Sequence, residues 1–338
     1  MHQFSQDALA RELSSHIPGF SKISGMRRFK AGQSNPTYQI DTPERTYVLR
    51  AKPPGKLLKG AHAVDREYRV MRALHQSDVP VPEVFYLSGE TSALGAQFFV
   101  MEHIEGRIFW DPALPEIPAR PEIYDAMNTT LAALHRVDPE TVGLGDYGPP
   151  SGYYARQLAT WGRAYKAAET EPLPDADWLQ AWLLEAMPAD DGLVCLTHGD
   201  FRLDNMIFAP DTARVSALLD WELSTLGHPF ADLAYQMMMW RMPHAGPFKG
   251  LGGLDRAALN LPSDALYTER YIARTGFSAP ESWVFYLVFA HFRFLAILQG
   301  VLARALQGNA ANPLGNAETR SAVEWLASAG KALVEDET

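Results

Sequence analysis

The sequence changes character near residue 107, and this change constrains the fold more than any other feature. The first hundred residues contain segments rich in β-branched and aromatic residues, such as TYQI, TYVLRA, VPVPEVFYL and AQFFVMEHI. Such segments are typical of strands. Beyond residue 107 most segments have the apolar spacing of helices, for example YDAMNTTLAALHRV, YYARQLATWGRAYKAAE and residues 280–307. The pattern predicts an α+β chain with a small β-rich N-terminal lobe and a larger helical C-terminal lobe.

Two segments depart from this division. AHAVDREYRVMRALHQ has helical spacing inside the strand-rich part, and MIFAPDTARVSALLDWE is predicted to form a β-hairpin inside the helical part. We expect an N-terminal lobe over residues 1–103, a hinge near 101–107 and a C-terminal lobe over 108–338. A cleft is expected between the two lobes.

Composition excludes several classes of protein. The chain has 338 residues, of which 47% are hydrophobic, and a net charge of −10, which disfavours broad nucleic-acid binding. Cys195 is the only cysteine, so no disulfide can form within the chain and a reducing compartment is expected. The N-terminal residues lack the apolar region of a secretory signal. WVFYLVFAHFRFLAIL has His291 and Arg293 at its centre and is shorter than the ~20 residues of a membrane span. We expect a cytoplasmic protein with no membrane or nucleic-acid partner, in which this segment is a buried helix.

The stretch LTHGDFRLDNMIF, residues 196–208, carries the strongest signal for chemistry. Asp200 and Asn205 are five residues apart, and Asp220 follows at the end of the apolar strand VSALLDWE. Asn205 and Asp220 offer hard oxygen ligands of the kind that Mg²⁺ takes beside phosphate oxygens. Asp200 then remains to accept a proton, which is the arrangement of a kinase catalytic centre. The alternative is an Asx-rich turn beside an ordinary capping aspartate.

A second signal lies upstream. Glu67 falls on the apolar stripe of its predicted helix, between Val64 and Met71, and an inward-facing carboxylate requires a cation. Arg50 and Lys52 are the candidates, in the preceding strand. In kinases, a cation on this strand that pairs with a helix glutamate holds the α- and β-phosphates. The alternative is a surface salt bridge.

Two further segments fit a nucleotide site. Gly32, Ser34 and Asn35 lie in a predicted turn between strands, where backbone N–H groups can bind phosphates. The FFVMEHIEG segment places the backbone of Glu102 and Ile104 where an adenine edge could pair with it. The alternatives are an ordinary hairpin and a simple linker. In this order along the chain, the segments predict phosphoryl transfer from ATP with Mg²⁺.

Four other residues have predicted supporting roles. His198 is expected to orient the loop that carries Asp200, and Asp232, in HPFADLAY, to anchor the backbone of that loop. Glu222 is either a ligand of a second metal or a solvated or helix-capping residue. Arg293 is either a paired core arginine or an anchor for a substrate phosphate or carboxylate.

The motifs HGDFRLDN, LLDWE, AGQSNPTY and YVLR resemble those of the aminoglycoside phosphotransferase and choline kinase group, which has a protein-kinase-like fold. Longer stretches, including LAALHRVDPETVGLGDYG and DWELSTLGHPFADLAY, resemble the kinase-like domain that occurs fused to acyl-CoA dehydrogenases. The resemblance covers nearly the whole chain. It implies that Asp200 is the base or hydroxyl-orienting residue, that Asn205 and Asp220 hold Mg²⁺, and that Arg50 fills the usual lysine position.

The same resemblance implies a substrate. It points to ATP-dependent phosphorylation of a small-molecule hydroxyl, with a 4-hydroxyacyl-CoA ester preferred, and to a functional link with an acyl-CoA dehydrogenase. Arg50 departs from the pattern because a guanidinium is not a compact point charge, so Lys52 is a second candidate for the phosphate contact. No protein-kinase activation segment follows DWE, since the A-P-E of this chain lies far downstream at residues 279–281, which argues against protein substrates. The alternatives are a kinase for another small alcohol or an aminoglycoside-type substrate, and a non-catalytic nucleotide-binding regulatory module.

Overall fold

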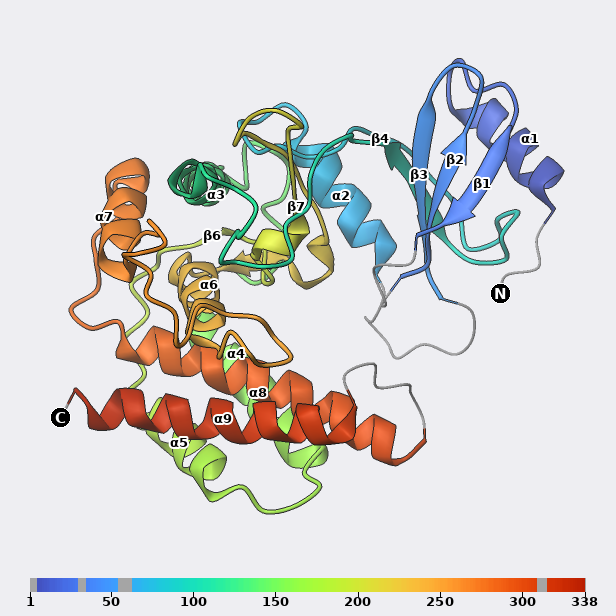
Figure 1. The fold of residues 1–338 in the computed structure, drawn as a ribbon. Coiled ribbons are helices and arrows are strands. Elements are labelled where there is room, and N and C mark those ends of the chain that lie inside the picture. Colours follow the sequence, from blue (N-terminus) through green and yellow to red (C-terminus); the bar gives the residue numbers. More distant parts are fainter. Residues whose placement is uncertain (1–4, 30–34, 54–62, 309–314, 338) are drawn as a thin grey trace. The chain divides into compact units, whose positions relative to one another are not determined.

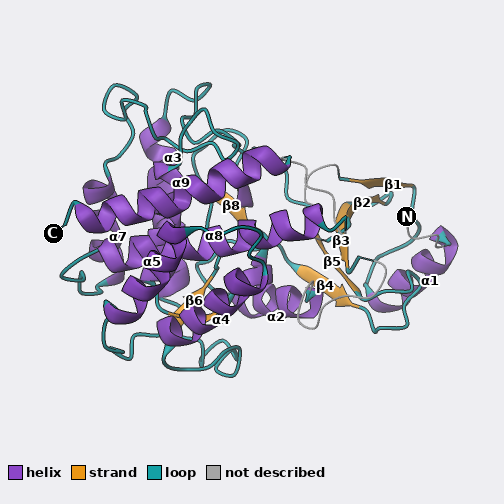
Figure 2. Ribbon diagram, turned by 90° about the horizontal axis from the view of Figure 1, so that it is seen from below, coloured by secondary structure: helices purple, strands orange, loops and turns teal. Residues whose placement is uncertain are grey.

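The computed structural model describes residues 5–29, 35–53, 63–308 and 315–337, so Gly32 and Ser34 lie outside the described residues. The chain forms two compact units (Figure 1). Unit 1 contains Met1–Ile108, Val142–Leu144 and Asn205–Ser224, and unit 2 contains Phe109–Thr141, Gly145–Asp204 and Thr225–Thr338. Unit 1 holds the larger sheet and unit 2 is mainly helical, which confirms the predicted α+β class (Figure 2). The predicted boundaries at 1–103 and 108–338 stay a prediction.

Unit 1 is built on a five-stranded antiparallel sheet with the strand order β1-β2-β3-β5-β4. Its strands are β1 (Gly25–Arg28), β2 (Thr37–Asp41), β3 (Thr46–Ala51), β4 (Val84–Leu87) and β5 (Phe98–Glu102). Helix α1 (Gln6–His16) buries Leu9 and Leu13 in one apolar cluster with Ile40, Leu49 and Val100 of the sheet. The register places Arg50 of β3 between Thr37 of β2 and Phe99 of β5.

Helix α2 (Val64–Leu74) presents the face that the sequence predicted. Val64, Glu67, Met71 and Leu74 are buried, at the three- and four-residue spacing of one helix face. The helix packs on β4, β5 and a short 3₁₀ turn, η2 (Trp221–Leu223). Glu67 is therefore carried into the interior of unit 1 by a helix whose other buried residues are apolar.

The predicted hairpin is present as β7 (Met206–Phe208) and β8 (Val215–Leu218) and belongs to unit 1. It is attached by backbone hydrogen bonds. Phe208 exchanges two 2.8 Å bonds with Arg107, and the Leu218 N–H donates to the Pro80 carbonyl at 2.8 Å. These bonds fix the hairpin whose open end carries Asn205 and Asp220.

Unit 2 is organised around one long helix, α8 (Val284–Leu306), which packs against four other helices. Figures 1 and 2 show α9 (Asn316–Glu335) running beside it. The sequence did not predict α9 or the shorter helix α7 (Asp264–Thr275). The remaining elements of unit 2 are α3 (Arg120–His135), α4 (Tyr153–Ala167), α5 (Pro174–Glu185), the strand pair β6 (Cys195–Thr197) and β9 (Thr225–Gly227), the 3₁₀ turn η1 (Leu203–Asn205) at the border with unit 1, α6 (Phe230–Arg241), α7 (Asp264–Thr275) and α9 (Asn316–Glu335).

Helix α8 is long and apolar enough to cross a membrane, with a mean hydropathy of 1.7, and it is the one such helix in the described part of the chain. Its apolar window is 78% buried inside the protein. Burial also lowers the pKa of His291, at the middle of the helix, to about 4. The predicted buried helix is confirmed.

Gly106 provides a test of how the hairpin is attached. A Cβ atom at this position would lie 2.2 Å from the Phe208 carbonyl oxygen and 2.4 Å from Ile207 Cγ2. We expect Gly106→Ala to lower the free energy of unfolding by about 1–3 kcal/mol, as overpacking does, because β7 must move away from Arg107. Urea unfolding measures the change. Gly89→Ala is the control, since nothing lies within 4 Å of its added Cβ; equal losses in both variants would contradict the proposed attachment.

Candidate active site

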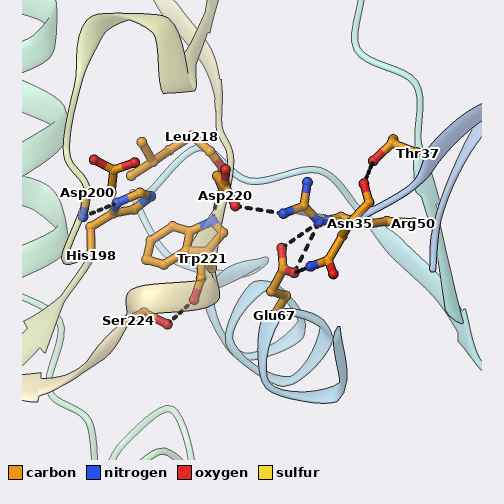
Figure 3. Close-up of polar contacts among 10 residues, drawn as sticks. All are labelled: Asn35, Thr37, Arg50, Glu67, His198, Asp200, Leu218, Asp220, Trp221 and Ser224. Atoms are coloured by element: carbon orange, nitrogen blue, oxygen red, sulfur yellow. Dashed lines mark hydrogen bonds and ion pairs between the residues drawn. The ribbon is translucent and has the colours of Figure 1, made fainter. Parts of the chain in front are cut away.

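Arg50 is held between two carboxylates in unit 1 (Figure 3). Its Nε atom lies 3.0 Å from the Glu67 carboxylate, and its guanidinium donates to Asp220 Oδ1 at 2.7 Å. The side chains of Arg50 and Glu67 are 11% and 2% exposed, whereas that of Asp220 is 31% exposed. The ion pair between the strand cation and the helix glutamate is present as predicted. Because the guanidinium is a fork, it engages both carboxylates at once.

The pKa values of this pair reflect burial and neighbouring charge. Burial lowers the pKa of Arg50, but the carboxylates of Glu67, Asp220 and Glu222 together raise it above its ordinary value. Burial raises the pKa of Glu67 to about 8, and Arg50 opposes this rise. Arg50 therefore remains a fixed positive charge, surrounded by three acidic side chains.

Asn35 supports Glu67 from the other side. Its Nδ2 donates to Glu67 Oε1 at 3.0 Å, and its carbonyl oxygen accepts from Thr37 Oγ1 at 3.0 Å (Figure 3). Asn35 is completely buried. Its side chain thus holds the glutamate of the ion pair, and the predicted phosphate contact by the backbone of its turn stays a prediction.

The other predicted nucleotide contacts differ in their local partners. Lys52 Nζ lies 3.2 Å from Glu90, so Arg50 and Lys52 contact different glutamates. The Glu102 N–H donates to the Glu83 carbonyl at 2.8 Å and is not open to an adenine edge. A contact through the Glu102 carbonyl or through the backbone of Ile104 stays a prediction.

The β7–β8 hairpin brings the two predicted metal ligands to one end of unit 1. Met206 pairs with Leu218, and the Leu219 N–H donates to the Asn205 carbonyl at 2.9 Å, so Asp220 follows the residue bonded to Asn205. The backbone of Asp220 is left-handed, with φ of 65°. Such a conformation costs a non-glycine residue about 1–3 kcal/mol and is concentrated at functional sites.

Asp200 in unit 2 is oriented by one hydrogen bond and one ion pair on the same oxygen. Tyr235 donates its hydroxyl proton to Asp200 Oδ1 at 2.8 Å, and Arg202 Nε lies 3.1 Å from the same atom. Arg202 also reaches Asp204 Oδ2 at 3.1 Å. Tyr235 was not singled out in the sequence, although it stands one helical turn from Asp232 in HPFADLAY. That spacing is the signal that could have identified it.

Asp232 anchors the loop that carries Asp200, as the sequence predicted. Its carboxylate accepts the His198 N–H at 2.6 Å and the Gly199 N–H at 2.8 Å. His198 in turn accepts the Asp200 N–H on Nδ1 at 3.2 Å, which matches its predicted orienting role (Figure 3). Gly199 has a φ of 82°, a conformation that glycine adopts without strain. The loop is therefore fixed through its backbone.

A third donor to Asp232 was missed in the sequence. His135 Nε2 lies 3.2 Å from Asp232 Oδ2, and its Nδ1 lies 2.7 Å from the Tyr271 hydroxyl. Since the carboxylate is the acceptor, His135 carries its proton on Nε2 and accepts from Tyr271. No local sequence pattern indicates this series of hydrogen bonds, because His135 and Tyr271 are separated by more than a hundred residues.

Arg293 is not the ion-paired core arginine that one alternative predicted. It is 5% exposed, and no described residue forms a hydrogen bond or ion pair with it. Every Asp and Glu of the chain is among the described residues. The guanidinium instead lies 5.6 Å from the Trp161 ring and 5.4 Å from the Tyr235 ring, distances at which a cation is attracted to an aromatic face. Its role as an anchor for a substrate anion stays a prediction.

Comparison with known proteins identifies the family. Residues 25–260 match the phosphotransferase enzyme family, and the chain belongs to it. A crystal structure from Ralstonia eutropha, of a protein provisionally named an aminoglycoside phosphotransferase, is 43% identical with a TM-score of 0.87, covering 98% of this chain and 99% of that one. The macrolide 2′-phosphotransferase of Brachybacterium faecium is 20% identical, with a TM-score of 0.59 over 95% of this chain and 97% of its own. The predicted protein-kinase-like fold is confirmed, and the chain is a phosphotransferase.

The chain is also similar, over most of its own length, to part of a protein named as an acyl-CoA dehydrogenase. Acyl-CoA dehydrogenase family member 10 of Mus musculus is 43% identical over 314 residues, which are 91% of this chain and 29% of that protein. The chain spans less than half the length of the curated relatives that it matches. This likeness confirms the predicted resemblance to the kinase-like domain of such dehydrogenases.

The contacts of Asp232 predict the cost of an isosteric change. Asp232→Asn places an amide NH₂ against a backbone N–H, because both carboxylate oxygens accept from the loop. We expect the free energy of unfolding to fall by about 3–5 kcal/mol, as when one partner of a buried charge pair is removed. Urea unfolding measures it. Asp177→Asn, at a pair whose side chains are about half exposed, is the control and should change stability by less than about 1 kcal/mol.

The difference in stability between the native chain and Asp232→Asn is predicted to depend on pH. Burial raises the pKa of Asp232, but hydrogen bonds and charge from His135 and His198 lower it below the ordinary 3.8. A carboxylate with a lowered pKa stabilises the fold above its unfolded pKa, and the contribution is lost as pH falls through the folded pKa. The stability gap between the native chain and Asp232→Asn should therefore be constant above about pH 5 and shrink below pH 3.8. A gap that widens in acid would contradict this assignment.

Proposed function

We propose that this phosphotransferase moves the γ-phosphate of ATP to the hydroxyl of a small-molecule acceptor, and that the acceptor is a hydroxyacyl-CoA ester such as a 4-hydroxyacyl-CoA. The main observation that supports phosphoryl transfer is the buried Arg50, which is held by Glu67 of α2 and by Asp220. A cation fixed in this way on a strand is suited to the α- and β-phosphates of a nucleotide.

Asp200 is the proposed acceptor-side residue. One of its oxygens is fixed by Tyr235 and Arg202, and its backbone is fixed by His198. The acceptor hydroxyl approaches the carboxylate, which orients it and takes its proton as the hydroxyl oxygen bonds to the γ-phosphorus. The bond from that phosphorus to the β-γ bridging oxygen breaks, and ADP leaves. Positioning of this kind supplies a large part of the rate enhancement in phosphoryl transfer.

Asn205 and Asp220 fit a Mg²⁺ ion carried by the nucleotide. Both offer oxygen atoms, and the hairpin register places them near one another at the end of unit 1. In the described ranges, no group of three or more His, Cys, Asp or Glu side chains could hold a metal ion. A site of two protein ligands suits Mg²⁺, which keeps several waters and binds beside phosphates. Bound there, the ion would neutralise phosphate charge.

The acceptor is proposed from likeness. The mouse relative that is 43% identical carries the name of an acyl-CoA dehydrogenase, which supports a CoA-linked acceptor and a functional link to such a dehydrogenase. The name of the Ralstonia protein, equally identical, supports an aminoglycoside-type acceptor as the second candidate. A non-catalytic nucleotide-binding module is the third, and the presence of Asp200, Asn205 and Asp220 argues against it.

The first test measures phosphate transfer from Mg-ATP by mass spectrometry. The acceptor panel contains 4-hydroxyacyl-CoA esters, their free acids, choline-like alcohols and aminoglycosides. We expect phosphorylated CoA ester from the native chain. Asp200→Asn should lower kcat by about 10²–10⁴, the usual contribution of general acid–base catalysis, while calorimetry finds unchanged ATP binding. Asp211→Asn, at an exposed turn, is the matched control.

The outcomes of this test separate the proposals. Phosphate on an alcohol or an aminoglycoside alone would retain the mechanism and reject the CoA ester. ATP binding without transfer to any acceptor would favour the regulatory module. Full activity in Asp200→Asn would reject Asp200 as the base or orienting residue.

A second test concerns the fork of Arg50. Arg50→Lys keeps the charge but reaches one carboxylate instead of two. Loss of one hydrogen bond between charged groups costs about 1.5–3 kcal/mol, so we expect the KM for ATP to rise about tenfold or more and the acceptor KM to stay unchanged. Steady-state kinetics measure both. Arg28→Lys, on an exposed strand position, should have no effect. An unchanged KM for ATP in Arg50→Lys would mean that a point charge suffices.

A further inference from the structure

Unit 2 contains a cavity of about 340 Å³ beside the loop that carries Asp200. Small-molecule sites in proteins begin at about this size. Three successive residues of the loop, Arg202, Leu203 and Asp204, form part of its wall, and Arg202 Nε lies 3.1 Å from Asp200. The other lining residues come from the segment after residue 108, from α6 and from the loop after it: Phe109, Trp110, Pro112, Phe201, Gln236, Met239, Trp240, Pro247, Phe248 and Lys249.

Most of the wall is apolar, and much of it is aromatic. Phe109, Trp110, Phe201, Trp240 and Phe248 contribute rings. Trp110 is 63% exposed, the largest exposed fraction among the exposed large apolar side chains of the described residues. An exposed tryptophan that lines a cavity marks a place where an apolar group can be buried.

The charges on the wall argue against a polycationic ligand. Arg202 and Lys249 are positive and Asp204 is negative. Arg202 pairs with Asp204 at 3.1 Å, and Lys249 pairs with Asp111 at 3.1 Å. The lining therefore carries no excess of negative charge that would attract several ammonium groups.

One lining residue is polar and buried without a partner. Gln236 on α6 is 1% exposed, and neither its Oε1 nor its Nε2 forms a hydrogen bond with any described residue. Its neighbour Tyr267 is also buried, and the Tyr267 hydroxyl likewise lacks a hydrogen-bonding partner in the described ranges. Burial raises the pKa of Tyr267, and the Gln236 side chain, which lies within hydrogen-bonding reach of the phenol, lowers it by a smaller amount.

An unsatisfied buried amide is costly, at about 1–3 kcal/mol, and such a group in a folded protein requires an explanation. Replacing it by an apolar side chain of similar shape would remove that cost. Its neighbour on α6, Tyr235, already donates to Asp200. The Tyr267 hydroxyl can meet only part of the hydrogen-bonding capacity of the Gln236 amide, which has two N–H groups and an acceptor oxygen. Gln236 is thus a buried polar group that the fold leaves incompletely bonded, next in sequence to a residue that orients the proposed base.

We propose that this cavity binds the apolar part of the acceptor, and that Gln236 Nε2 donates a hydrogen bond to a carbonyl oxygen in that part. The inference rests on the proposed function, because it assumes an acceptor that reaches Asp200. It adds a ligand class to it: a chain that is apolar, carries no cluster of positive charges and contains a carbonyl near the reacting hydroxyl. An acyl thioester has this chemistry, and an aminoglycoside does not.

The experiment compares two probes that differ by this carbonyl. S-pentanoyl-N-acetylcysteamine is a thioester, and S-pentyl-N-acetylcysteamine is the corresponding thioether. Neither carries a hydroxyl on the chain, so binding is measured by calorimetry without phosphoryl transfer. We expect the native chain to bind the thioester about tenfold more tightly than the thioether, the effect of one hydrogen bond. In Gln236→Met this preference should fall to about twofold or less, with binding of the thioether unchanged.

Thermal stability gives a second readout: Gln236→Met is expected to lose the preference for the thioester but to gain stability. Gln236→Met removes the unsatisfied amide, so we expect the midpoint of thermal unfolding without ligand to rise by about 2 °C. Gln299→Met is the matched control. Gln299 is 4% exposed, but its amide donates to the Ala168 carbonyl and to Thr170 Oγ1 at 3.0 Å each. That variant should unfold at a lower temperature and keep the native preference for the thioester.

The outcomes separate this inference from the proposed function. Loss of the thioester preference in Gln236→Met supports the cavity assignment, even where the native chain transfers no phosphate to a hydroxyacyl thioester and the proposed function fails. Transfer to that acceptor with an unchanged preference in Gln236→Met would overturn the assignment and leave the proposed function intact. A higher unfolding temperature with no probe binding in either protein would mean that the cavity holds only solvent, which also overturns it.

Discussion

The carboxylate of Asp232 accepts hydrogen bonds from the backbone N–H groups of His198 and Gly199 and from the His135 ring, and it is almost completely buried. A charge in this environment is tolerable only because all three donors point at it. The bonds act on the backbone of the catalytic loop, one and two residues before Asp200. The position of the proposed base is therefore determined by a helix, α6, rather than by the loop itself. Errors of about 1 Å at a reacting group can cost a hundredfold in rate, so this support matters for chemistry as well as stability.

The sequence predicted the elements and contacts that depend on local pattern. Strands β2 to β5 of the larger sheet, helix α2 and the β7–β8 hairpin follow from residue type and periodicity, and Glu67 on an apolar stripe indicated its need for Arg50. Asp232 was predicted, within HPFADLAY, to anchor the backbone of the loop that carries Asp200, and it is the third residue of α6. In each of these cases the physical cause lies within a few residues, or within one pair of neighbouring elements.

The features that the sequence did not predict depend on distant contacts. His135 of α3 bonds to Asp232, and Tyr271 of α7 bonds to His135. No pattern in either helix distinguishes a histidine of such a network from one of the core. The attachment of the hairpin through Arg107 and Pro80 joins residues more than a hundred apart. The hydrogen bond from the Asn35 amide to Glu67 joins a residue before β2 to helix α2 and was not predicted. A glutamine such as Gln236 is expected from the sequence to lie at the surface, and only the packed structure shows that its amide is buried.

Asp220 Oδ1 accepts a hydrogen bond from Arg50, and this has a consequence for the proposed nucleotide site. Under the proposed function, a magnesium ion at Asp220 would compete with Arg50 for this oxygen. Arg50 would then lose part of its countercharge, which phosphate oxygens would restore. In that proposal the metal and the nucleotide are coupled through Asp220, so that each would favour the binding of the other.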